Sequence, residues 1–286
     1  MGVEIPEEST TNNLQPTTMK KLIVFNWKSN PHNAASAIKL AQLVEKSIPK
    51  KNAPEVAIAP PFIFLEDVGK VIKKAALGSQ DAFWGDVGSY TGEISWHQEK
   101  HLKVKYVIVG HSERRKYLGE TDEMINKKVL AALKAGLKVV LCVGEPSRAA
   151  ARELRIKNAE LRKAKNYVRK QLEKDLKNSK FLILNSKLRN HLVIAYEPIW
   201  AIGAGHSDTP QDAVEMIKYI KEFSISNFSP YGGSPEGRQF SNIKVIYGGS
   251  VDGKNIKNFI QYKEIDGFLV GNASLKQKEF DRIIKA

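Results

Sequence analysis

The chain has 286 residues, of which 42% are hydrophobic, and its formal net charge is +14. This length suits a single α/β barrel, which commonly needs about 250 residues, and the one cysteine, Cys142, excludes an internal disulfide framework and a multi-cysteine zinc site. The sequence has no apolar run near the roughly 18 residues of a membrane span and no secretory signal pattern, so we expect a cytoplasmic protein without a membrane partner.

The first segment of the chain has the composition of a disordered tail. Residues 1–18 contain three Glu, no Lys or Arg, and many Ser, Thr, Asn and Pro. This composition predicts a disordered N-terminal extension. Met19 directly precedes the first predicted strand, so the alternative is that translation begins there and the extension is not native. Residues 19–286 are then expected to form one domain.

From Met19 onward, short β-branched runs alternate with amphipathic helical stretches, a pattern typical of parallel strands with crossover helices. Helix starts at Asn33, Thr121 and Thr209-Pro210, and a helix stop at Gly136, support this alternation. Eight β/α units without an early G-x-G-x-x-G favour a closed (β/α)8 TIM barrel over an open doubly wound sheet. The eight strands are predicted at 21–25, 56–59, 76–79, 106–109, 138–142, 192–196, 244–246 and 267–270.

The positive charge is concentrated between strands five and six. Residues 148–177 hold 11 Lys and Arg against four acidic residues, which leaves an excess of +7. A role in binding nucleic acid is the less favoured interpretation, because no aromatic stacking platform or base-reading motif accompanies the charges. An amphipathic helix with a solvated outer face is favoured instead, since its apolar residues recur at helical spacing: Leu154, Leu161, Val168, Leu172 and Leu176.

Chemically unusual residues follow the predicted strand ends. In a parallel barrel these positions converge on one rim, which is where barrel enzymes place their catalytic groups. The residues are Asn26 and Lys28 after strand one, His111 after strand four, Glu197 after strand six, and the glycine-bearing segments 248–250 and 271–272 after strands seven and eight.

Glu197 ends an apolar strand and precedes Pro198, which places its carboxylate at the barrel mouth, partly out of water. Partial removal from water makes a carboxylate more basic, so Glu197 is a candidate general base. The structural alternative is a carboxylate paired with a neighbouring Arg. The glycine-bearing stretch 199–205 predicts a hinged lid that closes over a substrate, and the alternative there is an ordinary connection with a buried Trp.

His111 opens a G-H-S-E-R-R segment in which Ser112 and Glu113 can cap a short helix. A helix N-terminus disfavours the imidazolium, so a neutral His111 could polarise a substrate carbonyl, although a strand-end His is more often structural. Lys28 could supply a fixed positive charge that Glu113 holds in place. The glycines could bind phosphate through backbone N–H groups or could simply form turns.

Seven segments, taken in order, resemble the triosephosphate isomerase family over residues 19 to about 280: F-N-W-K-S-N, Y-T-G-E-I-S, G-H-S-E-R-R-K-Y-L-G-E-T, C-V-G-E, A-Y-E-P-I-W-A-I-G-A-G, I-Y-G-G-S-V and L-V-G-N-A-S-L. The resemblance implies interconversion of dihydroxyacetone phosphate and D-glyceraldehyde 3-phosphate through an enediolate, with no cofactor or metal, in a homodimer. It implies that Glu197 is the base and His111 the electrophile, with Asn26, Lys28 and Glu113 beside them. The implied phosphate contacts are Gly203, Ser250, Gly271 and Asn272.

Several positions depart from the family pattern. Phe25 replaces a small residue, and Ser29 stands where Met is common, in a segment that family members pack against the loop around Thr91 of the partner subunit. Ala204 and the hinge 206–208 alter the lid, while Asn272 replaces a glycine but keeps its N–H and tolerates a left-handed conformation. These last departures motivate the alternative that the chain is a catalytically weakened barrel that binds phosphate compounds or a polyanion. A sugar-phosphate isomerase for a larger substrate is a third interpretation.

Overall fold

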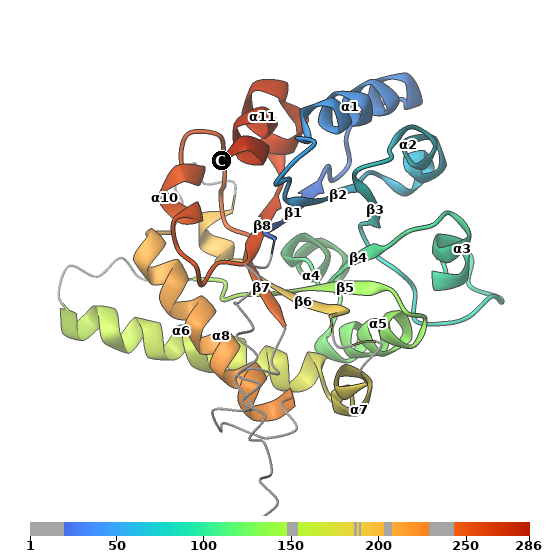
Figure 1. Cartoon of the computed structure of the whole chain (residues 1–286). Coiled ribbons are helices and arrows are strands. Elements are labelled where there is room, and N and C mark those ends of the chain that lie inside the picture. The colour runs from blue at the N-terminus through green and yellow to red at the C-terminus, as the bar shows by residue number, and fades with distance from the viewer. Residues whose placement is uncertain (1–19, 148–153, 186–187, 189, 203–207, 229–242) are drawn as a thin grey trace, which may run out of the picture.

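The computed structural model describes residues 20–147, 154–185, 188, 190–202, 208–228 and 243–286. Eight parallel strands in this part of the chain form a closed barrel in sequence order, and β8 pairs with β1 to complete the ring (Figure 1). The predicted extension at residues 1–18 lies outside the described residues. The strands are β1 Leu22–Asn26, β2 Glu55–Ala59, β3 Ala76–Ser79, β4 Tyr106–Val109, β5 Lys138–Val143, β6 Leu192–Tyr196, β7 Lys244–Tyr247 and β8 Gly267–Val270.

Helices surround the barrel on its outside (Figure 1). No helix in the described ranges is long and apolar enough to span a membrane. The α-helices are α1 Ala34–Ser47, α2 Leu65–Val71, α3 Trp96–His101, α4 Ser112–Leu118, α5 Asp122–Lys134, α6 Leu154–Asp175, α7 Lys180–Leu184, α8 Pro210–Phe228, α10 Ile256–Ile260 and α11 Gln277–Lys285. Short 3-10 helices are η1 Phe62–Phe64, η2 Ile199–Ala201 and η3 Asn272–Leu275.

The predicted (β/α)8 barrel is therefore confirmed, and its elements begin and end close to the predicted residues. Four strands have the predicted bounds, three differ by one residue at one end, and β1 is shifted by one residue at both ends. The side chain of Asn33 caps α1 by accepting the Ser36 N–H at 2.9 Å, and Thr121 caps α5. Gly136 follows α5 with a φ of 79°, a conformation that glycine adopts without a steric penalty.

The strands are buried on both faces, which explains their nearly continuous apolar runs. Alternate residues point to opposite faces of a strand, so one set fills the barrel interior and the other packs against the helices. Phe25 belongs to the outer set, and its ring lies 6.2 Å from that of Phe280 in α11. The interior set is Leu22, Val24, Ala57, Ala59, Tyr106, Ile108, Val140, Cys142, Val193, Ala195, Ile246 and Leu269.

Polar side chains close the end of the barrel at which the strands begin. The carboxylate of Glu55 in β2 accepts hydrogen bonds from the Tyr106 hydroxyl, from Lys138 at 3.0 Å and from Lys244 at 3.4 Å. These groups come from four strands and satisfy one another. The opposite end, where the strands finish, is therefore the end that opens to a ligand.

The described part of the basic segment forms the amphipathic helix α6 over Leu154–Asp175, as predicted, and residues 148–153 lie outside the described residues. Leu161, Val168, Leu172 and Leu176 are buried. Two of the outer lysines pair with neighbouring helices, Lys165 with Glu215 of α8 at 2.9 Å and Lys174 with Asp122 of α5 at 3.1 Å. The charges thus cover the solvated face of a helix that packs on the barrel.

Candidate active site

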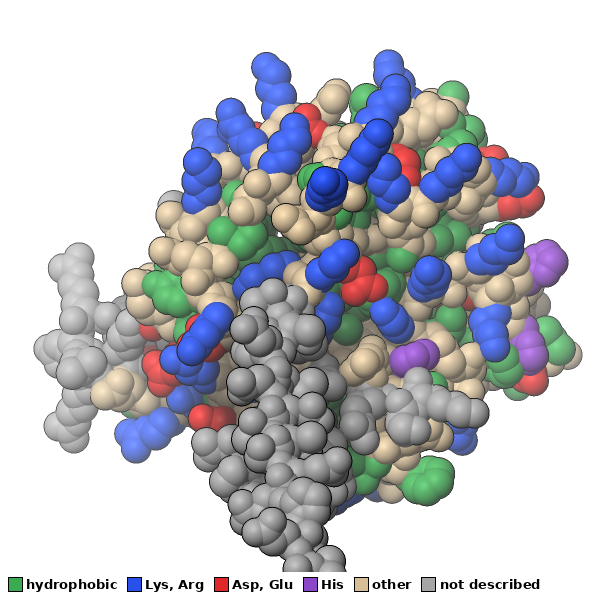
Figure 2. All heavy atoms as spheres, in the orientation of Figure 1, with side chains coloured by type: hydrophobic (Ala, Val, Ile, Leu, Met, Phe, Trp, Pro, Cys, Tyr) green, Lys and Arg blue, Asp and Glu red, His purple; other side chains and the backbone are tan. Residues whose placement is uncertain are grey.

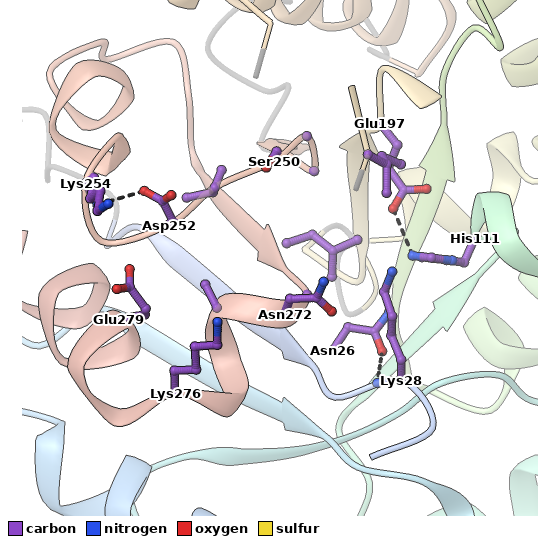
Figure 3. A pocket seen from close by; sticks show the side chains of 17 residues that line it. Asn26, Lys28, His111, Glu197, Ser250, Asp252, Lys254, Asn272, Lys276 and Glu279 are labelled. Carbon is purple, nitrogen blue, oxygen red and sulfur yellow. Dashed lines mark hydrogen bonds and ion pairs between the residues drawn. The ribbon is translucent and has the colours of Figure 1, made fainter. Parts of the chain in front are cut away.

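A pocket of about 470 Å³ lies at the carboxyl end of the strands (Figure 3). It collects residues from β1, β6, β8 and the loops after β4 and β7, which are far apart in sequence. Of the predicted site residues, the pocket is lined by Asn26, Lys28, His111, Glu197, Ser250, Gly271 and Asn272. Convergence of the strand ends therefore occurs as the barrel rule predicts.

The carboxylate of Glu197 is almost completely buried, with 2% of the residue exposed. Its Oε1 lies 3.2 Å from Nε2 of His111, and its Oε2 accepts the Ser112 N–H at 3.3 Å (Figure 3). These described partners are an imidazole and a peptide N–H, not the arginine of the structural alternative. Gly248 makes room for this side chain, because a Cβ there would lie 2.8 Å from Glu197 Cγ.

His111 itself caps α4, which corrects the expectation that Ser112 and Glu113 provide the cap. Its Nδ1 accepts the Glu113 N–H at 3.2 Å. A ring nitrogen that accepts a hydrogen bond carries no proton, so this contact assigns the proton of a neutral imidazole to Nε2. The Nε2–H group then faces Glu197 and the pocket.

The side chain of Lys28 forms an ion pair with Glu113, the partner expected from the sequence. The backbone of Lys28 is unusual, since its φ of 53° lies in the left-handed region that non-glycine residues rarely adopt. Two hydrogen bonds hold this backbone: Asn26 Oδ1 accepts the Lys28 N–H at 2.9 Å, and Gln80 Nε2 donates to the Lys28 carbonyl at 2.8 Å. The sequence analysis missed Gln80, because nothing in the local pattern links it to Lys28.

Two glycine-bearing loops form the far wall of the pocket. Gly271 lies against Lys28, and a Cβ there would come within 3.3 Å of Lys28 Cε. Asn272 opens the helix η3, so the left-handed conformation that asparagine tolerates is not used. Ser274 fixes this loop by donating from its N–H to the Gly271 carbonyl at 2.8 Å, and Asn255 holds the other loop through the Ser250 carbonyl at 2.8 Å.

The glycine-bearing part of the predicted lid, with Gly203 and Ala204, and the first two hinge residues lie outside the described residues, because 203–207 are not among them. Its two flanks are described. Glu145 accepts hydrogen bonds from the Tyr196 hydroxyl at 3.0 Å and from Trp200 Nε1 at 2.9 Å, and Tyr247 accepts the Asp208 N–H at 3.2 Å. The sequence analysis did not single out Glu145, Tyr196 or Tyr247.

Cys142 lies inside the barrel below Glu197. Burial raises the pKa of its thiol, and the negative charge of Glu197 raises it further. The thiol therefore stays protonated, and Cys142 contributes to packing of the barrel interior rather than acting as a nucleophile.

A network of buried charged side chains lies next to Gln80, the residue that contacts the Lys28 carbonyl. Asp81, which follows Gln80, accepts from Arg114 at 2.7 Å and from Lys128 at 2.7 Å, and both cations also contact Glu120. Burial raises the pKa of Asp81 to about 6, although Lys128 opposes this shift. The network connects the loop after β3 to α4, which contains Glu113, and to α5.

Glu99 in α3 is a second buried carboxyl group in this region. It is 0% exposed, and neither of its oxygens has a hydrogen-bond partner within the described part of the chain. Burial raises the pKa of Glu99 to about 8, while Ser79 opposes the shift and Asp81 adds to it. Glu99 is therefore mostly protonated at neutral pH.

No group of three or more His, Cys, Asp or Glu side chains in the described ranges is placed to hold a metal ion. The polar residues that line the pocket are three carboxylates, of which Glu197 is the one beside His111, an imidazole, lysines, amides and the glycine loops. This set can move a proton, polarise a carbonyl oxygen and bind an anionic group.

Comparison with known proteins adds a second line of argument. The family model described as triosephosphate isomerase matches residues 21–286. The chain is 41% identical over 269 residues to the triosephosphate isomerase of Thermoanaerobacter pseudethanolicus, covering 93% of this chain and 98% of that protein. It is 38% identical over 269 residues to that of Dictyoglomus thermophilum, covering 93% and 99%, and 38% identical over 261 residues to that of Mycoplasma genitalium, covering 91% and 96%.

Proposed function

The chain belongs to the triosephosphate isomerase family, and from that premise we propose that it interconverts dihydroxyacetone phosphate and D-glyceraldehyde 3-phosphate through the side chains gathered in the pocket. The observation that carries this proposal is the contact between Glu197 and His111, at 3.2 Å, in a pocket that also contains Lys28. One base, one neutral donor and one cation are the groups that an enediolate mechanism needs.

In this mechanism the Glu197 carboxylate removes a proton from the carbon next to the carbonyl carbon. The electron pair of that C–H bond forms the C=C bond of an enediolate, and the carbonyl oxygen gains the negative charge. The hydroxyl proton on the carbon that lost its proton then passes through His111 to the former carbonyl oxygen. Glu197 gives the proton that it holds to the former carbonyl carbon, a new carbonyl forms at the other carbon, and the carboxylate is regenerated. A buried carboxylate suits this task because it is weakly solvated.

His111 and Lys28 stabilise the enediolate oxygens. Because Nδ1 of His111 accepts the Glu113 N–H, the proton of the imidazole is on Nε2, and this N–H turns from the Glu197 carboxylate to the substrate oxygen when the substrate binds. The ammonium of Lys28 adds a fixed positive charge, held by Glu113 on one side and by the backbone bonds to Asn26 and Gln80 on the other. Groups fixed in advance cost little reorganisation when charge develops.

The phosphate group of the substrate binds at the glycine loops, with contacts to Ser250, Gly271 and Asn272. Backbone N–H groups at such loops after the last two strands are the usual phosphate ligands of barrel enzymes. Gly203 would contribute from the lid. This places the three-carbon chain between the loops and Glu197, which line the same pocket.

A coupled assay with each triose phosphate tests the function. Turnover in both directions without added metal or cofactor is expected. Absence of turnover, together with salt-sensitive binding to nucleic acid, would favour the alternative of a weakened, polyanion-binding barrel.

The enzyme forms a homodimer in this proposal. Exposed large apolar side chains support it, since most of those in the described ranges lie on the segments that follow the neighbouring strands β2, β3 and β4. A second copy of the chain would remove this surface from water. The side chains are Ile63, Val87, Tyr90, Tyr117 and Leu118, with exposed fractions of 78%, 71%, 48%, 70% and 62%.

A cytoplasmic location is also part of this proposal. The single, unpaired Cys142 supports a reducing compartment, where thiols persist. Fractionation of the source cells with an antibody against the chain tests this expectation.

A further inference from the structure

The pocket that contains Glu197 does not end at the glycine loops. It continues past Ser250 and Asn272 to two lysines, Lys254 in the loop between β7 and α10, and Lys276 just before α11 (Figure 3). Both side chains are exposed. The phosphate end of the site therefore opens toward solvent between two cationic groups.

These two ammonium groups differ from that of Lys28. Lys28 is paired with Glu113, whereas no ion pair or side-chain hydrogen bond in the described part of the chain involves the ammonium group of Lys254 or Lys276. An unpaired ammonium group keeps its full charge available to an incoming anion.

Two carboxylates also line this part of the pocket, but peptide N–H groups engage them. Asp252 Oδ1 accepts the N–H of Lys254 at 2.7 Å and of Asn255 at 2.8 Å, and Glu279 Oε2 accepts the Gly253 N–H at 2.7 Å. These bonds hold both carboxylates against the loop backbone. The lysine side chains remain free to move toward a ligand.

The positive surface continues outside the pocket. A neighbouring hollow of about 540 Å³ between α10 and α11 is lined by four basic side chains, Lys254, Lys257, Arg282 and Lys285, and by one acidic side chain, Asp281, together with the C-terminal residue Ala286. Lys and Arg side chains gather over the upper part of the face in Figure 2, where α10 and α11 lie. An anion that approaches the pocket from this side meets a positive potential.

We propose that Lys254 and Lys276 form an outer anion subsite, at which the phosphate group of an incoming phosphate monoester binds before it reaches the glycine loops. This inference rests on the proposed function and adds an entry step to it. The lysines contact the phosphate and not the reacting carbons. They act on the capture of substrate, which determines kcat/KM, and not on the chemical step.

The physical basis is long-range attraction, which salt weakens. At an ionic strength of 0.1 M the screening length is about 10 Å. Two exposed lysines at the entrance therefore attract a more distant phosphate group strongly only in dilute salt. An excess of positive charge at the entrance of a cleft can raise the association rate of an anion by about 10-fold or more. Around this entrance the basic side chains Lys254, Lys257, Lys276, Arg282 and Lys285 outnumber the acidic side chains Asp252, Glu279 and Asp281. The subsite therefore predicts a specific dependence of kcat/KM on salt.

The test compares two double variants that lose the same charge. One is Lys254→Gln with Lys276→Gln. The matched control is Lys100→Gln with Lys134→Gln, two exposed lysines in the last turns of α3 and α5. Kinetic constants for glyceraldehyde 3-phosphate are measured at ionic strengths of about 0.02 M and about 0.3 M, and binding of inorganic phosphate is measured by calorimetry.

We expect the Lys254/Lys276 variant to lose about 3- to 10-fold in kcat/KM in dilute salt, with kcat unchanged and with little difference from the parent in concentrated salt. Its affinity for inorganic phosphate falls by a similar factor, and the control matches the parent in both measurements. Equal kcat/KM and equal phosphate affinity in the two double variants would overturn the subsite. If the unaltered chain shows no turnover, the proposed function fails, and the phosphate measurement still decides the subsite.

Discussion

His111 places its Nε2 atom 3.2 Å from Oε1 of Glu197 while its Nδ1 atom accepts the N–H of Glu113. One nitrogen of the imidazole therefore accepts a hydrogen bond from the backbone of α4, and the other faces the carboxylate of Glu197. A bound substrate has to replace this contact, so that its oxygen receives the Nε2–H of His111 and its C–H group meets the carboxylate of Glu197.

Replacement of the base tests its role in proton transfer. We expect Glu197→Gln to lower kcat by about 10²- to 10⁴-fold, because an amide of the same shape cannot accept the proton. The amide oxygen can still accept the Ser112 N–H, so the fold should be retained. Steady-state kinetics and thermal unfolding measure the two effects. Full activity in this variant would exclude the mechanism.

His111→Gln separates two functions of the imidazole. Loss of the oxyanion donor should lower kcat by about 10²- to 10³-fold. Loss of the cap on α4 should destabilise the fold by about 1 kcal/mol, since Nδ1 no longer accepts the Glu113 N–H. Steady-state kinetics measures the loss of kcat, and urea unfolding measures the loss of stability. A variant that is destabilised but fully active would show that His111 is only a helix cap.

Gln80 holds the backbone of Lys28 in place, so replacing Gln80 should weaken substrate binding. Gln80→Met removes hydrogen bonds to the carbonyls of Lys28, at 2.8 Å, and of Ala59, at 2.9 Å. We expect KM to rise and stability to fall by about 1–3 kcal/mol. Gln98→Met is the control. It also removes a side-chain hydrogen bond, to Ser95 in the capping box of α3, but Ser95 does not line the pocket, whereas Lys28 does. A KM equal to that of the control would contradict a role in positioning Lys28.

Glu99 predicts a dependence of stability on pH. Its pKa is about 8 in the folded protein and near 4.5 when unfolded, so the folded state binds the proton more tightly. Its stabilising contribution is complete below about pH 4.5 and is lost as pH rises to about 8, with a total on the order of a few kcal/mol.

Glu99→Gln removes this titration. Urea unfolding of parent and variant between about pH 5 and pH 9 should therefore show that the parent loses more stability than the variant as the pH rises. Parallel stability curves for the two proteins would mean that Glu99 is not protonated in the folded state.

The exposed apolar side chains on the segments after β2, β3 and β4 predict which substitutions dissociate the dimer. We expect Val87→Asp with Tyr90→Asp to shift the protein from dimer to monomer in light scattering, because two charges would be buried in the contact. Phe181→Asp is the control, as Phe181 is 83% exposed but lies on α7, away from the segments after β2 to β4. A monomeric parent would refute the dimer itself.

The strands and the convergence of Glu197, His111 and Lys28 could be predicted from the sequence because both follow from local patterns. Strand positions come from apolar runs between turn residues, and the barrel topology then brings the strand ends together. The motifs of the family supplied the substrate, which no single residue indicates.

Contacts that depend on tertiary structure could not be predicted. Lysine has no preference for a positive φ, so the left-handed conformation of Lys28 arises from Asn26 and Gln80, which lie on different β/α units. Likewise, Glu145 and Tyr247 are polar and aromatic residues without a distinguishing spacing, and only the closed barrel brings them next to the flanks of the lid.

The order of the strands has one more consequence. Every strand pairs with its neighbour in sequence except at the single contact between β1 and β8, and Lys20 and Ala286 line the same surface hollow. The ring therefore has no unique starting strand: joining residue 286 to residue 20 and cutting the chain at another surface loop would keep all eight pairings. Circular permutants of this chain should therefore form the same barrel.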